Sequence, residues 1–70
     1  MDKTSLTKLA NRIKELRKKY KYTQDELSFK AGIERSTLGN IETVQNDVTF
    51  TKVCKIAKAF DLSLSEFLNF

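Results

Sequence analysis

The spacing of the apolar residues is the feature that most limits what this chain can fold into. Near the amino end, the apolar positions recur at intervals of three and four: Leu6, Leu9, Ala10, Ile13, Leu16 and Tyr20. An α-helix gathers residues with this spacing into one stripe, whereas a strand needs sustained alternation, which no segment shows. The chain also has no proline and only two glycines, so few positions break a helix. We therefore predict an all-α fold whose first helix covers about residues 5–20.

Two four-residue patterns mark further helix starts. Thr23 precedes Glu26 by three positions, and Ser63 precedes Glu66 by three. In a capping box of this kind, the hydroxyl and the carboxylate each accept a hydrogen bond from a backbone N–H that the helix leaves unpaired. The second and fifth helices are therefore predicted to begin at residues 24 and 64.

The remaining boundaries follow from Gly32 and from a polar loop. Gly32 suits the left-handed residue that ends a helix, and a third helix is predicted over about 34–43. Residues 44–48 lack periodicity, and Thr49 then caps a fourth helix over about 50–60. The second helix is expected to turn Leu27 and Ala31 inwards, with Ser28 and Phe29 alongside. On the fourth, the expected buried residues are Phe50, Val53, Cys54, Ile56, Ala57 and Phe60.

Length and residue types exclude several classes of protein. Seventy residues are enough for one small domain over residues 1–70 and leave no room for a second module. Without histidine and with Cys54 as the only cysteine, a structural zinc site, a Cys-His nucleophile and a Ser-His-Asp triad are excluded. We therefore expect no enzyme, no metal, no cofactor and no small-molecule ligand. One cysteine favours the reducing cytoplasm over secretion.

The chain shows neither a membrane span nor a signal peptide. Its apolar runs are at most two residues long, and its first twenty residues are charged rather than apolar. The net charge of +4 is unevenly placed, because residues 1–40 hold ten Lys/Arg against five Asp/Glu, and residues 41–70 hold three against four. A basic half favours an anionic partner, with nucleic acid ahead of an acidic membrane surface.

The second and third helices are predicted to form a helix-turn-helix over about residues 24–43, with Gly32 supporting the sharp turn. Two short helices crossed in this way place the second in the major groove of DNA, with its first residues at the base edges. The alternative at this point is a helical pair that only packs, since such pairs are common.

A series of motifs along most of the chain favours the DNA-binding interpretation of this helical pair. The motifs in order are Arg12-Ile13, Leu16-Arg17, the run 22–27 (YTQDEL), Ala31-Gly32-Ile33, Leu38, Ile41-Glu42, and the runs 55–60 (KIAKAF) and 63–67 (SLSEF). In these residues the chain resembles the Cro/CI-type (XRE-like) helix-turn-helix family of small phage repressors and restriction-modification controllers, over about residues 8–68. The resemblance implies a compact five-helix, lambda-repressor-like domain that binds double-stranded operator DNA as a homodimer.

The resemblance also implies roles for individual residues. Arg35, Ser36 and Asn40 correspond to the base-contacting positions, while Gln24 and Thr37 correspond to DNA backbone contacts. Arginine donates to guanine O6 and N7, and asparagine pairs with adenine, so the residue types suit base reading. The alternative is an exposed polar face on a helix that phosphate contacts hold in place.

In the family, an arginine of the first helix pairs with a glutamate at the end of the third. Arg17 and Glu42 occupy these positions, so the pair is expected to fix the recognition helix, and Arg17 also to contact a phosphate. The alternative is an isolated surface ion pair, which contributes roughly 0–1 kcal/mol.

Three features depart from the family pattern. The loop 44–48 lacks the usual glycine, proline and basic residues, and its Asp47 would be repelled by a nearby phosphate, so loop contacts to DNA are in doubt unless Lys52 or Lys55 compensates. Glu34 replaces a small hydroxyl residue at the cap of the third helix. Gly39 lies within that helix, where it costs roughly 1 kcal/mol against alanine.

The last helix carries more apolar side chains than one small core is expected to absorb. Leu64, Phe67 and Phe70 are therefore candidates for the dimer interface, and the alternative is that the two phenylalanines close the core of the monomer.

The leading hypothesis is a sequence-specific transcriptional regulator, either a dimeric repressor or an operon controller, that reads a palindromic operator through its third helix. The alternative is a protein-interaction module on the same fold, an antitoxin or a coactivator-like adaptor with weak DNA binding.

Overall fold

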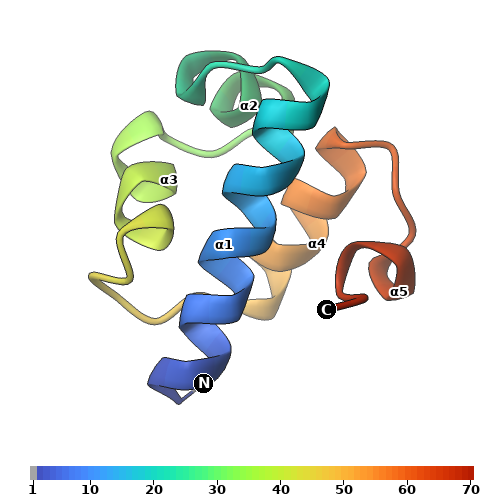
Figure 1. Ribbon diagram of the computed structural model, residues 1–70. Coiled ribbons are helices and arrows are strands. Elements are labelled where there is room, and N and C mark those ends of the chain that lie inside the picture. Colours follow the sequence, from blue (N-terminus) through green and yellow to red (C-terminus); the bar gives the residue numbers. More distant parts are fainter. Residues whose placement is uncertain (1) are drawn as a thin grey trace.

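The computed structural model describes residues 2–70 as five helices. They are α1 (Lys3–Tyr20), α2 (Gln24–Ala31), α3 (Arg35–Glu42), α4 (Phe50–Ala59) and α5 (Leu64–Phe67). Helix α1 runs through the middle of the molecule, α2 lies at its carboxyl end, α3 and α4 lie on its two sides, and α5 lies beside α4 (Figure 1). The predicted all-α architecture is confirmed. Helix α1 starts before the predicted residue because the Asp2 carboxylate caps it, accepting from the N–H of Ser5 at 2.8 Å.

All five helices contribute to one apolar core. Its members are Leu9, Ile13 and Leu16 of α1, Leu27 and Ala31 of α2, Leu38 and Ile41 of α3, Val53, Ile56 and Ala57 of α4, Phe67 of α5, and Val48 and Phe60 from the connecting segments. The ring of Phe60 packs against Tyr20 and Tyr22, with ring centroids 5.2 and 6.0 Å apart. Burying a large apolar side chain contributes about 1.5–3 kcal/mol, so this core is the main term that holds the helices together.

Three apolar residues are placed differently from the prediction. Phe29 is 87% exposed, because Leu27, Ser28 and Ala31 occupy the inner face of the short helix α2. Phe50 is 66% exposed, and Cys54, one turn later on the same edge of α4, is only partly buried. The prediction that Phe50 belongs to the core is wrong, because the buried face of α4 is centred on Val53, Ile56 and Ala57.

The predicted capping boxes are both present. Thr23 Oγ1 accepts from the N–H of Glu26 at 3.0 Å, and Glu26 Oε1 accepts from the N–H of Thr23 at 2.9 Å. Ser63 and Glu66 repeat this arrangement at 3.1 and 2.9 Å. Gly32 adopts a left-handed conformation (φ 69°) and ends α2, as predicted.

The capping carboxylates should make stability depend on pH. The backbone N–H of Thr23 lowers the pKa of Glu26, and that of Ser63 lowers the pKa of Glu66, because each bond favours the charged form. A lowered pKa in the folded state stabilises the fold above the ordinary value of 4.5, and this contribution is lost as the pH falls below it. The Glu26→Gln, Glu66→Gln double variant should therefore lose less stability than the parent on acidification. Urea unfolding at pH values from neutral to about 3 measures the free energy of unfolding of the parent and of the double variant. If the two free energies fall in parallel, the prediction is contradicted.

Candidate nucleic-acid interface

Helices α2 and α3 meet at a tight turn with a defined geometry. After Gly32, the N–H of Ile33 donates to the carbonyl of Ser28 at 3.0 Å, and the chain enters α3 at Arg35. Glu34 occupies the cap position of α3, but its side chain makes no capping hydrogen bond. The departure seen in the sequence at Glu34 therefore leaves the first turn of α3 without the side-chain cap that α1, α2, α4 and α5 have.

The inner and outer faces of α3 carry different kinds of residue. Leu38, Ile41 and Glu42 are buried, whereas Arg35, Ser36 and Asn40 are exposed and Thr37 is partly buried. Asn40 and Thr37 line a small hollow that Asp47 of the loop and Lys52 of α4 also line. The structure therefore brings the predicted base-contacting residues to one accessible helix, with Lys52 beside it. Lys55 lies elsewhere, in a hollow with Phe29 and Lys30.

The carboxylate of Glu42 is the anchor of α3. It accepts from Arg17 twice, Nε to Oε2 at 2.9 Å and Nη2 to Oε1 at 3.1 Å, and from Gln24 Nε2 at 2.9 Å. Its side chain is only 3% exposed. The predicted Arg17–Glu42 pair is therefore present, and it is a buried network rather than an isolated surface pair.

The network also determines how two of the predicted phosphate contacts are placed. Arg17 Nη1 donates to the carbonyl of Tyr22 at 3.2 Å, so all three guanidinium nitrogens bond within the chain. Gln24, at the first position of α2, directs its amide towards Glu42. The bond from Gln24 was not predicted, because no spacing rule links the start of α2 to the end of α3.

A second pair crosses the turn, and sequence reasoning missed it. Nε of Arg35 lies 2.8 Å from Oδ1 of Asp25, in the first turn of α2, and both side chains are largely exposed (63% and 78%). The two residues are ten positions apart on different helices, so neither helical periodicity nor the capping pattern connects them.

Helix α5 is held against α1 by Arg12, through bonds that the sequence did not predict. Arg12 Nε donates to the carbonyl of Phe67, and Nη2 donates to the carbonyl of Glu66, both at 2.9 Å. Phe67 is fully buried and stacks on Phe60 at 6.3 Å. Phe67 is therefore wrong as a candidate for an accessible dimer surface. Leu64 is partly buried, and Phe70 is 53% exposed.

Comparison with known proteins identifies the protein family of the chain. A sequence model of the helix-turn-helix family matches residues 13–67, which is most of the chain. The chain belongs to the helix-turn-helix family. Antitoxin HipB of Escherichia coli K12 is 38% identical over 61 residues, covering 87% of this chain and 69% of HipB. An uncharacterized helix-turn-helix transcriptional regulator of Archaeoglobus fulgidus is 32% identical over 62 residues, covering 89% of each chain.

Solved structures of helix-turn-helix proteins show the same fold. The restriction-modification controller protein C.AhdI of Aeromonas hydrophila superposes with a TM-score of 0.85 at 33% identity, covering 91% of this chain and 97% of the controller. The controller protein C.Esp1396I gives a TM-score of 0.87 at 26% identity, with 93% and 84% covered. The family is one of DNA-binding regulators rather than enzymes, and the five-helix, lambda-repressor-like fold predicted from the sequence is confirmed.

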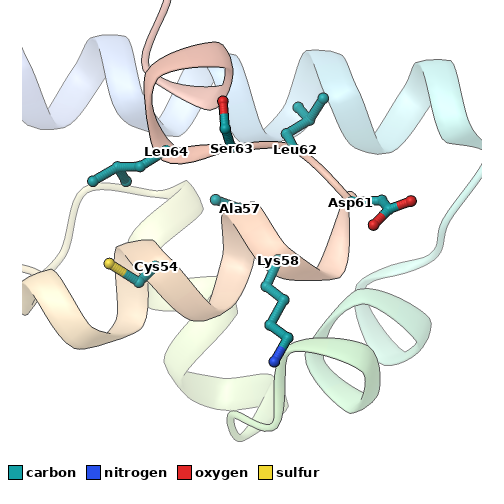
Figure 2. Close-up of a pocket in the computed structure, with 7 residues that line it drawn as sticks. All are labelled: Cys54, Ala57, Lys58, Asp61, Leu62, Ser63 and Leu64. Carbon is teal, nitrogen blue, oxygen red and sulfur yellow. The ribbon is translucent and has the colours of Figure 1, made fainter.

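Outside the helix-turn-helix, an open hollow lies between α4 and α5 (Figure 2). Lys58 extends away from the hydroxyl of Ser63 there, and Cys54 and Asp61 lie at opposite ends. Within residues 2–70, no three His, Cys, Asp or Glu side chains gather as metal ligands would, and no helix is long and apolar enough to cross a membrane. The polar side chains that converge on one another lie around α2 and α3, where Arg17 and Gln24 meet Glu42.

Proposed function

We propose that this helix-turn-helix protein is a sequence-specific transcriptional regulator, a dimeric repressor or operon controller, that reads a palindromic operator with α3 in the major groove. The observation that carries the proposal is the division of α3 into a buried, anchored face and an exposed face bearing Arg35, Ser36 and Asn40. A helix fixed in this way presents its side chains to base edges in a constant orientation. Arg35 suits guanine and Asn40 suits adenine.

The contacts to the DNA backbone are assigned to residues around the reading face. Gln24 begins α2, where the helix dipole favours a phosphate, and Thr37 lies on the neighbouring helix α3. Gln24 donates one of its two amide N–H groups to Glu42, and Arg17 donates three of its five N–H groups within the chain, so both keep donors for a phosphate. Lys52 supplies a positive charge that the loop 44–48 lacks. Each phosphate neutralised adds about −0.9 to the slope of log affinity against log salt, so binding should weaken steeply as salt rises. The proposed location is the cytoplasm, because DNA is found there and because its reducing environment keeps a single cysteine free.

The proposed dimer uses an apolar face formed by α4, α5 and the end of the chain. Phe50 and Leu68 line an almost wholly apolar groove floored by Leu9, Val48 and Val53. The Phe70 ring at the carboxyl end is half-exposed, and Leu64 is partly buried. A second copy would cover this apolar surface and place two recognition helices about 34 Å apart, one turn of DNA. Phe50 replaces Phe67 as the proposed contact.

The test is selection of bound duplexes from a random DNA pool near 0.1 M salt. We expect a two-fold symmetric site whose half-sites lie about one helical turn apart. Phe50→Asp should enrich single half-sites, whereas Thr51→Asp, which adds the same charge at the neighbouring exposed position, should enrich the full site. No enrichment by the folded protein would refute operator reading, and single half-sites from the parent chain would refute the dimer.

A second candidate function is supported by the similarity to antitoxin HipB and by the loop 44–48, which has no basic residue and carries the acidic Asp47. In this alternative the chain is a protein-interaction module with weak DNA binding. It predicts no preferred sequence in the same selection, so that experiment separates the two functions. It also predicts that affinity for DNA depends only weakly on salt concentration.

A further inference from the structure

We infer that Asp25 is a positioning residue that holds the guanidinium of Arg35 for bidentate recognition of guanine. The inference rests on the proposed function and adds to it a residue on α2 that fixes specificity without touching a base. It is carried by the one ion pair that joins α2 to the first residue of α3.

The geometry of the pair leaves the reading end of Arg35 available. Asp25 meets the guanidinium through Nε, its inner nitrogen, at 2.8 Å. In the described part of the chain, no further ion pair or hydrogen bond engages the Arg35 guanidinium. The two terminal nitrogens, four of the five N–H donors of the group, remain to donate to O6 and N7 of guanine.

Fixing this side chain in advance should favour binding. Arginine has several rotatable bonds and loses much conformational freedom when it is immobilised at an interface. A side chain already held by Asp25 loses less on meeting DNA. Because both members of the pair are largely exposed, the pair contributes little to folding, and its effect should be visible in DNA binding instead.

The charge of Asp25 has the opposite effect on general affinity for DNA. A carboxylate near the reading end of α2 and α3 repels phosphates, whichever sequence is bound. Removing the charge should therefore raise affinity for unrelated DNA while it lowers the preference for guanine. A residue with a merely structural role would not move these two quantities in opposite directions.

The experiment is a double-mutant cycle measured by fluorescence anisotropy near 0.1 M salt. The parent, Asp25→Asn, Arg35→Ala and the double variant are titrated with the selected operator, with that operator carrying A·T in place of the G·C pair that Arg35 reads, and with an unrelated duplex. Asp25→Asn should reduce the preference for G·C about 3- to 5-fold and bind the unrelated duplex at least as tightly as the parent. In the Arg35→Ala background it should not change the preference. Asp61→Asn, which removes an exposed charge at the far end of α4, is the matched control.

Three other outcomes would overturn the inference, and the measured preferences tell them apart. If Asp25→Asn leaves the preference unchanged, or lowers it equally without Arg35, Asp25 does not position that side chain. If Asp25→Asn raises the preference for the operator, the pair restrains Arg35 in a non-binding state. If Arg35→Ala itself leaves the preference for G·C intact, base reading by Arg35 fails and the proposed function loses that contact as well. Thermal unfolding of each variant confirms that it is folded.

Discussion

Arg35→Ala is expected to lower the preference for one base pair of the DNA site by about 1–3 kcal/mol, while preferences at the other positions are kept. Arg35 is the first residue of α3 and is 63% exposed, and arginine at such a position donates two bonds to guanine. When the side chain is removed, guanine O6 and N7 lose both donors, whereas adenine at the same position loses little. The change is therefore one of selectivity as well as affinity.

Binding of single-base variants of the selected site, measured with the parent and Arg35→Ala, provides this number. Lys55→Ala is the matched control, because it removes one positive charge from a hollow that no residue of α3 lines. It should weaken all duplexes equally, if it weakens them at all. A uniform loss from Arg35→Ala would identify Arg35 as a phosphate contact and leave base reading to Ser36 and Asn40.

Glu42→Ala is expected to lower the free energy of unfolding by about 2–3 kcal/mol. Removing one partner of a fully buried ion pair costs about 3–5 kcal/mol, and the figure is lower here because Arg17 is 24% exposed and water partly solvates it. Both Arg17 and Gln24 lose their acceptor in this variant. For a chain of this size, the loss corresponds to a fall of about 8–24 °C in the melting temperature.

Urea unfolding followed by circular dichroism measures this loss. Glu15→Ala is the control, because Glu15 is exposed and its pair with Arg12 is long, at 3.4 Å. We expect this change to alter the free energy of unfolding by no more than about 0.5 kcal/mol. Glu42→Gln keeps the shape of the side chain and removes its charge, so it should lie between these two variants. Equal losses from Glu42→Ala and Glu15→Ala would show that the buried network adds no stability.

The elements that could be predicted from sequence are those whose determinants are local. A capping box involves residues three apart, so Thr23 with Glu26 and Ser63 with Glu66 could be identified directly. The left-handed Gly32 is equally local. The Arg17–Glu42 pair spans 25 positions and was predicted only through the family resemblance.

The errors and omissions share a physical cause, which is that packing between helices is not encoded in spacing along one helix. Phe50 falls within the apolar periodicity of α4, yet that edge of the helix is uncovered in the described residues. Phe67 resembled a surplus apolar residue, yet Phe60 and the Arg12 bonds hold it inside. Arg12 itself was missed because its acceptors are backbone carbonyls, which carry no residue identity that a sequence pattern could reveal.

The separation of the two faces of α3 has a consequence for how such a chain can diverge. Leu38, Ile41 and Glu42 fasten the helix to the rest of the molecule. On its outer face, Arg35 pairs with Asp25 of α2, but both side chains are largely exposed, so that pair contributes little to folding. Under the proposed function, mutations at the outer positions would alter which genes are controlled without endangering the fold. Duplicated copies could then acquire different targets by a few substitutions, because natural selection acts on stability and on DNA preference at different residues.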